Sequence, residues 1–125
     1  MKIEHLESSL KMRNLHFRHC SIERKPEITS GELNVDLSKE IEKIAEHDYS
    51  VTLQLSASNE DIRLLIVANA QFHYEGKDGT REDKIVQNNT VAIIYPYVRS
   101  QVTLMTSQPG MNPIVLPPIN TTKLN

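Results

Sequence analysis

Hydrophobic and polar residues alternate one by one along three stretches of the first half of the chain. Such alternation is typical of β-strands that bury one face. The first stretch covers residues 10–23, and its apolar phase slips by one residue near Arg13 and Asn14, which predicts a β-bulge there. The other two stretches cover residues 33–37 and 49–57.

A fourth strand is predicted over residues 62–74. The run is almost continuously apolar as far as Ala70, and alternation then resumes at Phe72 and Tyr74. A strand that is apolar at successive positions is covered on both faces over part of its length, which is typical of a central strand.

One principal helix is predicted over residues 89–107. Asn89 or Thr90 can cap its first turn, and Pro96 would then lie in the first turn or at a kink. The dipeptide Pro109-Gly110 ends the helix. Residues at helical spacing give it one apolar face: Ile94, Val98, Val102 and Met105.

Residues 39–47 are ambiguous, because helix propensity favours a short helix that Ser38 would cap, with Ile41, Ile44 and Ala45 on one face. After the principal helix, the prolines between residues 113 and 118 require an extended segment. The whole pattern predicts an α+β fold, in which a meander of about four antiparallel strands packs on one long helix. Residues 1–9 would form a polar lead to a single domain over residues 10–125.

The charged residues are distributed unevenly along the 125-residue chain. Sixteen acids against 14 Lys and Arg give a net charge of −2, which argues against a general nucleic-acid binder. From Thr90 onward only Arg99 and Lys123 are charged, so this part is expected to be buried in the core or against a partner. The longest apolar run, residues 91–95, is far short of the roughly 20 residues of a membrane helix. A single cysteine, Cys20, and the lack of an apolar leader fit the cytoplasm.

Candidate catalytic chemistry is sparse. His16, His19 and Cys20 are the densest set of possible metal ligands, but on a regular strand His16 and Cys20 share one face and His19 points to the other. A small metal-dependent enzyme is therefore only a remote alternative, and no cofactor motif is present. The absence of a catalytic set, together with abundant half-apolar surface, favours a protein that binds other chains, either copies of itself or an extended client.

Two motifs lie in the last third of the chain: Tyr95-Pro-Tyr-Val-Arg99, and Ile-Val-Leu-Pro-Pro-Ile-Asn over residues 114–120. They resemble the Phe-Pro-Tyr-Ala-Arg-like helix motif and the Leu-x-x-Pro-Val-Asn-Phe-like segment of the bacterial export chaperone SecB. The strand stretches at 10–23, 32–37 and 49–57 also resemble those of the family, so the likeness covers about residues 10–120.

This resemblance implies a four-stranded antiparallel sheet on a long helix, assembled as a homo-oligomer, either a dimer or a dimer of dimers. It implies a non-catalytic chaperone that binds unfolded, export-bound polypeptides in apolar grooves without a cofactor. Client contacts would be made by Leu33, Val35 and Leu37. A structural and assembly role would fall to the motif residues Tyr95, Pro96, Tyr97, Arg99, Pro117, Pro118 and Asn120.

The sequence departs from the family pattern at three places. The family has a loop or irregular strand at residues 39–47, so helix and strand both stay open there. The family's second helix and acidic tail have no counterpart after residues 114–120, so part of a groove is expected to stay uncovered. The family's acidic docking surface for the SecA motor is half matched, because Glu23 aligns with one acid but His19 replaces another and the third falls near Leu64 or Leu65. A second hypothesis is a fold relative dedicated to one specific protein, for example as a toxin–antitoxin chaperone.

Overall fold

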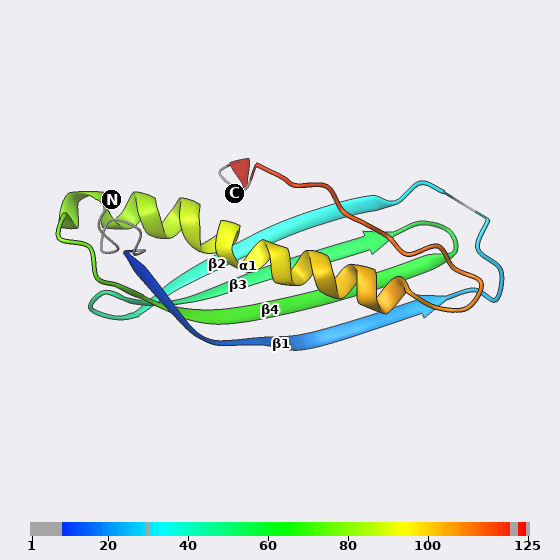
Figure 1. Cartoon of the computed structure of the whole chain (residues 1–125), viewed down its shortest axis with the longest axis horizontal. Coiled ribbons are helices and arrows are strands. Elements are labelled where there is room, and N and C mark those ends of the chain that lie inside the picture. The colour runs from blue at the N-terminus through cyan, green and yellow to red at the C-terminus, as the bar shows by residue number, and fades with distance from the viewer. Residues whose placement is uncertain (1–8, 30, 121–122, 125) are drawn as a thin grey trace, which may run out of the picture.

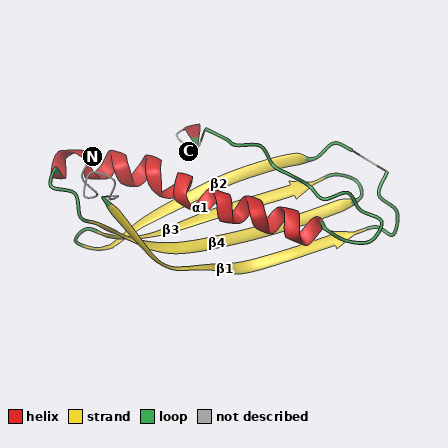
Figure 2. Ribbon diagram, viewed as in Figure 1, coloured by secondary structure: helices red, strands yellow, loops and turns green. Residues whose placement is uncertain are grey.

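One antiparallel sheet of four strands is covered on one face by a single long helix in the computed structural model, which describes residues 9–29, 31–120 and 123–124 (Figures 1 and 2). The predicted α+β fold is therefore confirmed, whereas the polar lead lies, apart from Ser9, outside the described residues. The elements are β1 (Leu10–Arg24), β2 (Asn34–Ala45), β3 (Asp48–Ser58), β4 (Ile62–Tyr74), the 3-10 turn η2 (Gly79–Arg81) and α1 (Glu82–Thr106).

The strands lie in the order β1-β4-β3-β2. The expected meander therefore holds for β2, β3 and β4 only, because β1 pairs with β4 and not with β2. The connection over residues 25–33 consequently crosses the end of the sheet from one edge to the other (Figure 1). It is fixed by the β3–β4 turn: Asn59 Nδ2 donates to the Glu32 carbonyl over 2.9 Å, and the Thr29 amide donates to Asp61 Oδ2 over 3.0 Å.

The bulge predicted near Arg13 and Asn14 is confirmed. The register against β4 shifts between Arg13 and His16, and Asn14 has a φ of 54°, a conformation that asparagine tolerates better than most residues. A second shift, between Phe17 and His19, is not apparent from the sequence. It changes which residues share a face of β1, with consequences for the candidate ligands discussed below.

The short helix considered for residues 39–47 is wrong. Residues 39–45 continue β2, which pairs with β3 as Lys39 with Leu53 and Ile41 with Val51, and residues 46 and 47 form a turn. Helix propensities differ by only tenths of a kcal/mol per residue, whereas the strand gains a full ladder of backbone hydrogen bonds and half-buries Ile41. The strand ends at Ala45, and His47 takes a φ of 63° in the turn to β3.

Helix α1 begins at Glu82, seven positions before the predicted Asn89. Its first turn carries Glu82 and Asp83, whose negative charge is favourable at a helix N-terminus. Thr90 caps nothing; it is buried within the helix and its hydroxyl donates to the Val86 carbonyl over 2.6 Å. Pro96 lies inside the helix and not in its first turn. Because Pro96 and Ala92 are both exposed, water can satisfy the carbonyl that the proline leaves without a donor.

The core lies between α1 and the face of β3 and β4 that α1 covers. Alternate residues of both strands point into it, and the register places them side by side. The opposite face of the sheet, called the open face here, carries the other residue set of every strand. The largest fully buried side chains are Phe72, Leu53, Leu55, Leu64, Ile66, Ile94, Val51, Val86, Val91, Val98 and Val102.

A buried carboxylate joins the start of α1 to the β2–β3 turn. Glu82 accepts hydrogen bonds from the Tyr49 hydroxyl and from His47, whose Nδ1 lies 2.6 Å from Oε1. The hydrogen bond from Tyr49, supported by His47, lowers the pKa of Glu82 although burial opposes the shift. Burial, followed by the bond to Glu82, raises the pKa of Tyr49 to about 12. The cluster therefore holds an ionised Glu82 against a neutral Tyr49 at neutral pH.

Replacing Glu82 by Gln should lower the free energy of unfolding at pH 7 by about 1–3 kcal/mol, because buried donors lose a charged acceptor. The folded pKa of Glu82 lies below its ordinary 4.5, so its stabilisation is complete above that pH and is lost as pH falls through the folded value. The difference between the two proteins should therefore shrink between pH 5 and pH 3 in urea unfolding. Asp83→Asn, an exposed change in the same turn, is the control, and equal destabilisation by both changes at pH 7 would contradict this account.

Candidate functional site: an apolar groove beside β2

The segment after α1 turns back along the helix and lies beside β2 (Figure 1). Gly110, with a φ of 74°, makes the turn in a conformation that favours glycine. Residues 111–120 contain neither helix nor strand, as the prolines predict. The helix fixes the segment first at Ile114. Thr103 Oγ1 donates to the Ile114 carbonyl, and the Ile114 amide donates to Thr106 Oγ1, each over 2.8 Å.

Tyr95 provides the second anchor. Its hydroxyl donates to the Pro117 carbonyl over 2.7 Å, and its ring is buried between α1 and the segment. Burial raises the pKa of Tyr95, an effect that the nearby Arg99 partly offsets, so the hydroxyl remains a neutral donor at physiological pH. The segment is therefore fixed by its backbone to the helix, while its side chains are turned to other neighbours.

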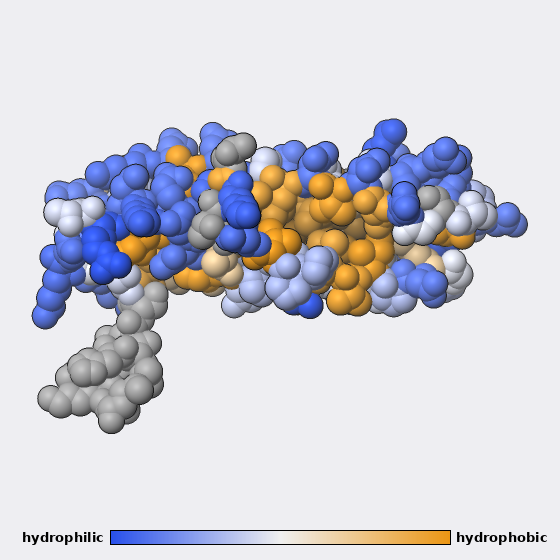
Figure 3. Space-filling view, turned by 90° about the horizontal axis from the view of Figure 1, so that it is seen from above, coloured by the Kyte–Doolittle hydropathy of each residue, from blue (hydrophilic) through white to orange (hydrophobic). Residues whose placement is uncertain are grey.

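Two hollows lie beside this segment, one against β2 and one against the connection that precedes β2. One, of about 350 Å³, is lined by Val35, Leu37, Leu116 and Ile119, with Leu55 and Tyr95 among its other walls. The next, of about 390 Å³, lies between the crossing connection and the start of the segment. Figure 3 shows a broad apolar area, hollowed at its centre, on this side of the molecule. We call the two hollows together the β2 groove, defined by Leu33, Val35 and Leu37 on one wall and Ile114, Leu116 and Ile119 on the other.

The groove has a buried floor and an exposed rim. Leu55 and Tyr95 are buried, and Leu116 is only 7% exposed. Val35 and Ile119, by contrast, expose 43% and 38% of their surface. Apolar side chains at a groove rim, with a preformed floor beneath them, provide a site for further apolar groups. The outer edge of β2 borders the same groove, since β2 is the last strand of the sheet on that side.

The residues that the sequence assigns to client contact lie together in this groove. Val35 and Leu37 line one hollow, and Leu33 lines the next. Their opposite wall is less evident from the sequence, in which Leu116 is only one apolar residue of an uncharged, proline-rich stretch. Ile119 lies in the 114–120 motif, but neither Ile119 nor Leu55 is marked by the sequence as a groove residue, because that role depends on how the segment folds back.

The motif residues divide between two sides of the helix. Tyr95 and Pro117 meet in the anchor, and Asn120 lines the groove. Pro96 and Arg99 instead line a shallow hollow with Val115, on the outward side of α1. Tyr97 also points outward and is 48% exposed. Pro118 is exposed on the segment. The motif thus fixes the segment on one side and leaves an apolar surface on the other.

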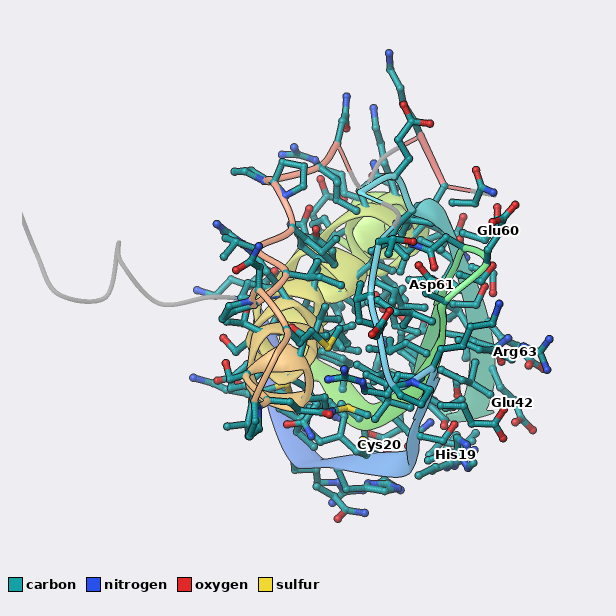
Figure 4. The ribbon with its side chains drawn as sticks, turned by 90° about the vertical axis from the view of Figure 1, so that its right-hand side faces the viewer. His19, Cys20, Glu42, Glu60, Asp61 and Arg63 are labelled. Carbon is teal, nitrogen blue, oxygen red and sulfur yellow. The ribbon has the colours of Figure 1, made fainter. Side chains whose placement is uncertain are left out.

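The possible metal ligands do not converge. Because of the second register shift, His16 and His19 pair with Asn69 and Val67 and lie on the open face, whereas Cys20 pairs with Ile66 on the helix side (Figure 4). The expectation that His16 and Cys20 share a face is therefore wrong. Cys20 Sγ instead lies 3.8 Å from Gln101 Nε2 of α1. Within the described ranges, no group of three or more His, Cys, Asp or Glu side chains could hold a metal ion.

Glu23, the acid aligned with the family's motor-docking surface, is exposed on the open face and pairs in register with Arg63. Its neighbours along β1 on that face are Ser21 and His19. A cation directly opposite and a histidine nearby leave this corner of the sheet without the acidic character that would attract a basic partner.

Together these features define a class of protein: an α+β domain with one long helix on a four-stranded antiparallel sheet and an apolar groove along one sheet edge. The family model described as "SecB: Preprotein translocase subunit SecB" matches residues 5–125. The chain therefore belongs to the SecB family, as its motifs predict.

Solved structures share the fold. The SecB-like chaperone Rv1957 of Mycobacterium tuberculosis, in complex with a ChAD peptide from the Rv1956 HigA1 antitoxin, matches with a TM-score of 0.65 and 17% identity, over 89% of this chain and 91% of that one. A protein of unknown function from Streptococcus agalactiae matches with a TM-score of 0.56 and 8% identity, over 86% and 96%. No curated protein matches the chain. The helix of the described part is not long and apolar enough to cross a membrane.

Replacing Tyr95 by Phe tests the anchor. The change removes the bond to the Pro117 carbonyl and keeps the buried ring, so we expect unfolding to become easier by about 0.5–1.5 kcal/mol. The amide hydrogens of Ile114, Val115, Leu116 and Ile119 should exchange faster, while those of β3 keep their protection. Tyr97→Phe, at an exposed position on the same helix, is the control. Unchanged exchange in the segment of the Tyr95 variant would show that the hydroxyl does not fix it.

Proposed function

We propose that this protein is a non-catalytic, SecB-like chaperone of the cytoplasm that binds unfolded polypeptides in the β2 groove and needs no cofactor. The observation that carries the proposal is the groove itself, in which exposed apolar side chains stand over a buried apolar floor beside a free strand edge. Membership of the SecB family and the shared fold of a SecB-like chaperone support it.

The spacing of the groove suits an extended client. Leu33, Val35 and Leu37 follow one another at every second residue, so their side chains repeat at about 6.6 Å. Every second side chain of an extended polypeptide repeats at the same interval. A client lying along the groove can therefore present one apolar side chain to each position in turn, while its backbone lies beside the outer edge of β2. Because backbone groups and generic apolar contacts supply the affinity, many sequences can bind.

Substituting Val35 by Ser, alone and with Leu33→Ser, is expected to weaken binding of a reduced, unfolded protein. Losing one apolar contact of this size corresponds to roughly a 5- to 10-fold rise in Kd. Binding is measured by fluorescence anisotropy at micromolar concentration, together with suppression of client aggregation. Ile44→Ser is the matched control, because Ile44 lies on the same strand and is 46% exposed, against 43% for Val35, but does not line the groove.

The result that contradicts the proposal is equal affinity of the Val35 and Ile44 variants, with thermal melting confirming that both are folded. Failure of the unmodified protein to bind any unfolded client would contradict it more broadly.

A more specialised role is a second candidate. The solved complex of the Mycobacterium tuberculosis SecB-like chaperone with an antitoxin peptide supports it. In that case one dedicated protein would occupy the groove of this chain in place of many clients. Affinity purification distinguishes the two roles: one stoichiometric partner indicates the dedicated role, and a spectrum of unfolded proteins indicates the general one.

We also propose that the chain assembles as a homo-oligomer, a dimer or a dimer of dimers, through the outward side of α1. Tyr97 and Leu104 are seven residues apart and so lie on one helical face. Leu104 and Val115 are each 68% exposed, and the chain carries no acid from Thr90 onward. We call Tyr97 and Leu104 the outward stripe. Burying this stripe against a second copy would remove its apolar side chains from water.

Leu104→Glu should therefore reduce the mass of the oligomer in sedimentation equilibrium, because it introduces a charge into the outward stripe. Ile44→Glu, at another exposed apolar residue, should leave the mass unchanged. If Leu104→Glu has the mass of the unmodified protein, the outward stripe is not an assembly surface.

A further inference from the structure

The second hollow of the β2 groove, of about 390 Å³, lies between two walls that come from distant parts of the chain. One wall is the crossing connection, which contributes Ile28, Thr29, Gly31 and Leu33, and the other is the start of the segment after α1, residues 110–114. Neither wall, in its described residues, is a helix or a strand. No backbone ladder therefore sets the distance between them there, and the width of this hollow has to be set by side chains.

Each wall is attached separately to its own side of the fold. The connection is bound to the β3–β4 turn, where the Thr29 amide and hydroxyl both donate to Asp61 Oδ2, over 3.0 and 3.3 Å. The segment is bound to α1 through Ile114, as described above. Among the described residues, no hydrogen bond runs directly from residues 25–33 to residues 107–114. The two walls therefore need a third group to hold them together.

Arg24, the last residue of β1, joins the two walls with one side chain. Its Nη2 donates to the Pro26 carbonyl and its Nη1 to the Pro109 carbonyl, each over 3.1 Å. Pro26 lies just before the lining residues of the connection, and Pro109 just before those of the segment. A third bond of 3.1 Å, from Nε to the Lys25 carbonyl, orients the guanidinium. Because a planar guanidinium holds its donors in a fixed fork, the two proline carbonyls are kept at a fixed separation.

The bonds of Arg24 lie at the surface, which separates their effect on shape from their effect on stability. Pro26 and Pro109 are both exposed, so water can replace the guanidinium at their carbonyls when Arg24 is changed. The guanidinium also lies close to the turn that begins the segment, since a Cβ added at Gly110 would stand 3.9 Å from its Nη2. Loss of Arg24 should therefore leave the chain folded but free the two walls to move relative to each other.

We propose that Arg24 is a positioning residue for polypeptide binding: its guanidinium sets the width of the second hollow, so that apolar side chains of a client can contact Leu33. This inference rests on the proposed binding of clients in the β2 groove. The first hollow, which Val35 and Ile119 border, has its own anchor in the bond from Tyr95 to the segment. Arg24 therefore acts on one end of the groove and leaves the other unchanged.

A double-mutant cycle on client binding tests this role. Arg24→Gln should raise the Kd for reduced and carboxymethylated lysozyme, which stays unfolded, by roughly 5- to 10-fold, as Leu33→Ser does. The two changes together should bind within about twofold of either one alone, because they remove the same contact. Arg24→Gln combined with Val35→Ser should instead multiply the two separate losses, because Val35 lies in the other hollow. Thermal melting confirms that each variant is folded.

Two further variants distinguish positioning from charge. Arg24→Lys keeps the positive charge but replaces the fork by one ammonium group, so its Kd should stay within about twofold of that of Arg24→Gln. Arg13→Gln is the matched control, because Arg13 lies on the same strand and also donates from its Nε, to Gln71, but lines neither hollow. It should leave the Kd unchanged. Full affinity in Arg24→Lys, or an equal loss in Arg13→Gln, would overturn the proposal, because charge alone would then explain the effect.

Amide hydrogen exchange without a client separates this inference from the proposed function. The Met111 amide donates to the Gln108 carbonyl over 3.1 Å, in the turn that Arg24 holds through Pro109. In Arg24→Gln this amide should exchange about threefold faster or more, because the turn loses its attachment to β1. Unchanged exchange, or unchanged client affinity where Val35→Ser weakens binding, would overturn the role of Arg24 and leave the proposed function standing. Unchanged affinity in Val35→Ser would contradict the proposed function, and this inference with it.

Discussion

The packing of α1 on β3 and β4 is the constraint on which the rest of this structure depends. A sheet of four strands with one helix can be covered along one face only, and the helix covers the central pair of strands. The helix therefore leaves the sheet face partly uncovered at the β2 edge. The segment after the helix covers part of that area. Leu116 reaches the core, while Val35 and Ile119 remain at the surface. The β2 groove is the part of this apolar surface that the helix and the segment leave uncovered.

The hydrogen bonds that anchor the segment to the helix determine the shape of the β2 groove. Tyr95 and Thr103 hold its backbone to the helix by hydrogen bonds to carbonyls. These bonds do not require particular side chains on the segment, so its apolar residues are free to line the groove. The carboxylate of Glu82 performs a comparable task at the other end of the helix, where it accepts bonds from His47 and Tyr49. The helix is thus fixed at its start to the sheet and along its second half to the segment.

Much of the fold is predictable from the sequence, because alternation and helical spacing report directly on burial. The strands, the bulge near Asn14 and the extended proline segment follow from local patterns. The failures have physical causes of three kinds. Residues 39–47 have helix propensity, but pairing with β3 outweighs it. The first turns of α1 bury little more than Val86 and Glu82, so their pattern does not differ from that of a loop. The second shift in β1 depends on the partner strand, which reverses the expected faces of His19 and Cys20.

The candidate site was predictable in part for the same reason. Leu33, Val35 and Leu37 form a visible row at every second residue, just before and within β2. The opposite wall exists only once the segment folds back, so Leu116 and Ile119 could not be paired with them in advance. The most direct test of the groove as a polypeptide site is site-specific photo-cross-linking. A photoreactive residue at position 119 should cross-link to an unfolded client, and the same residue at position 44 should not. Equal cross-linking from both positions, or none from position 119, would contradict the account.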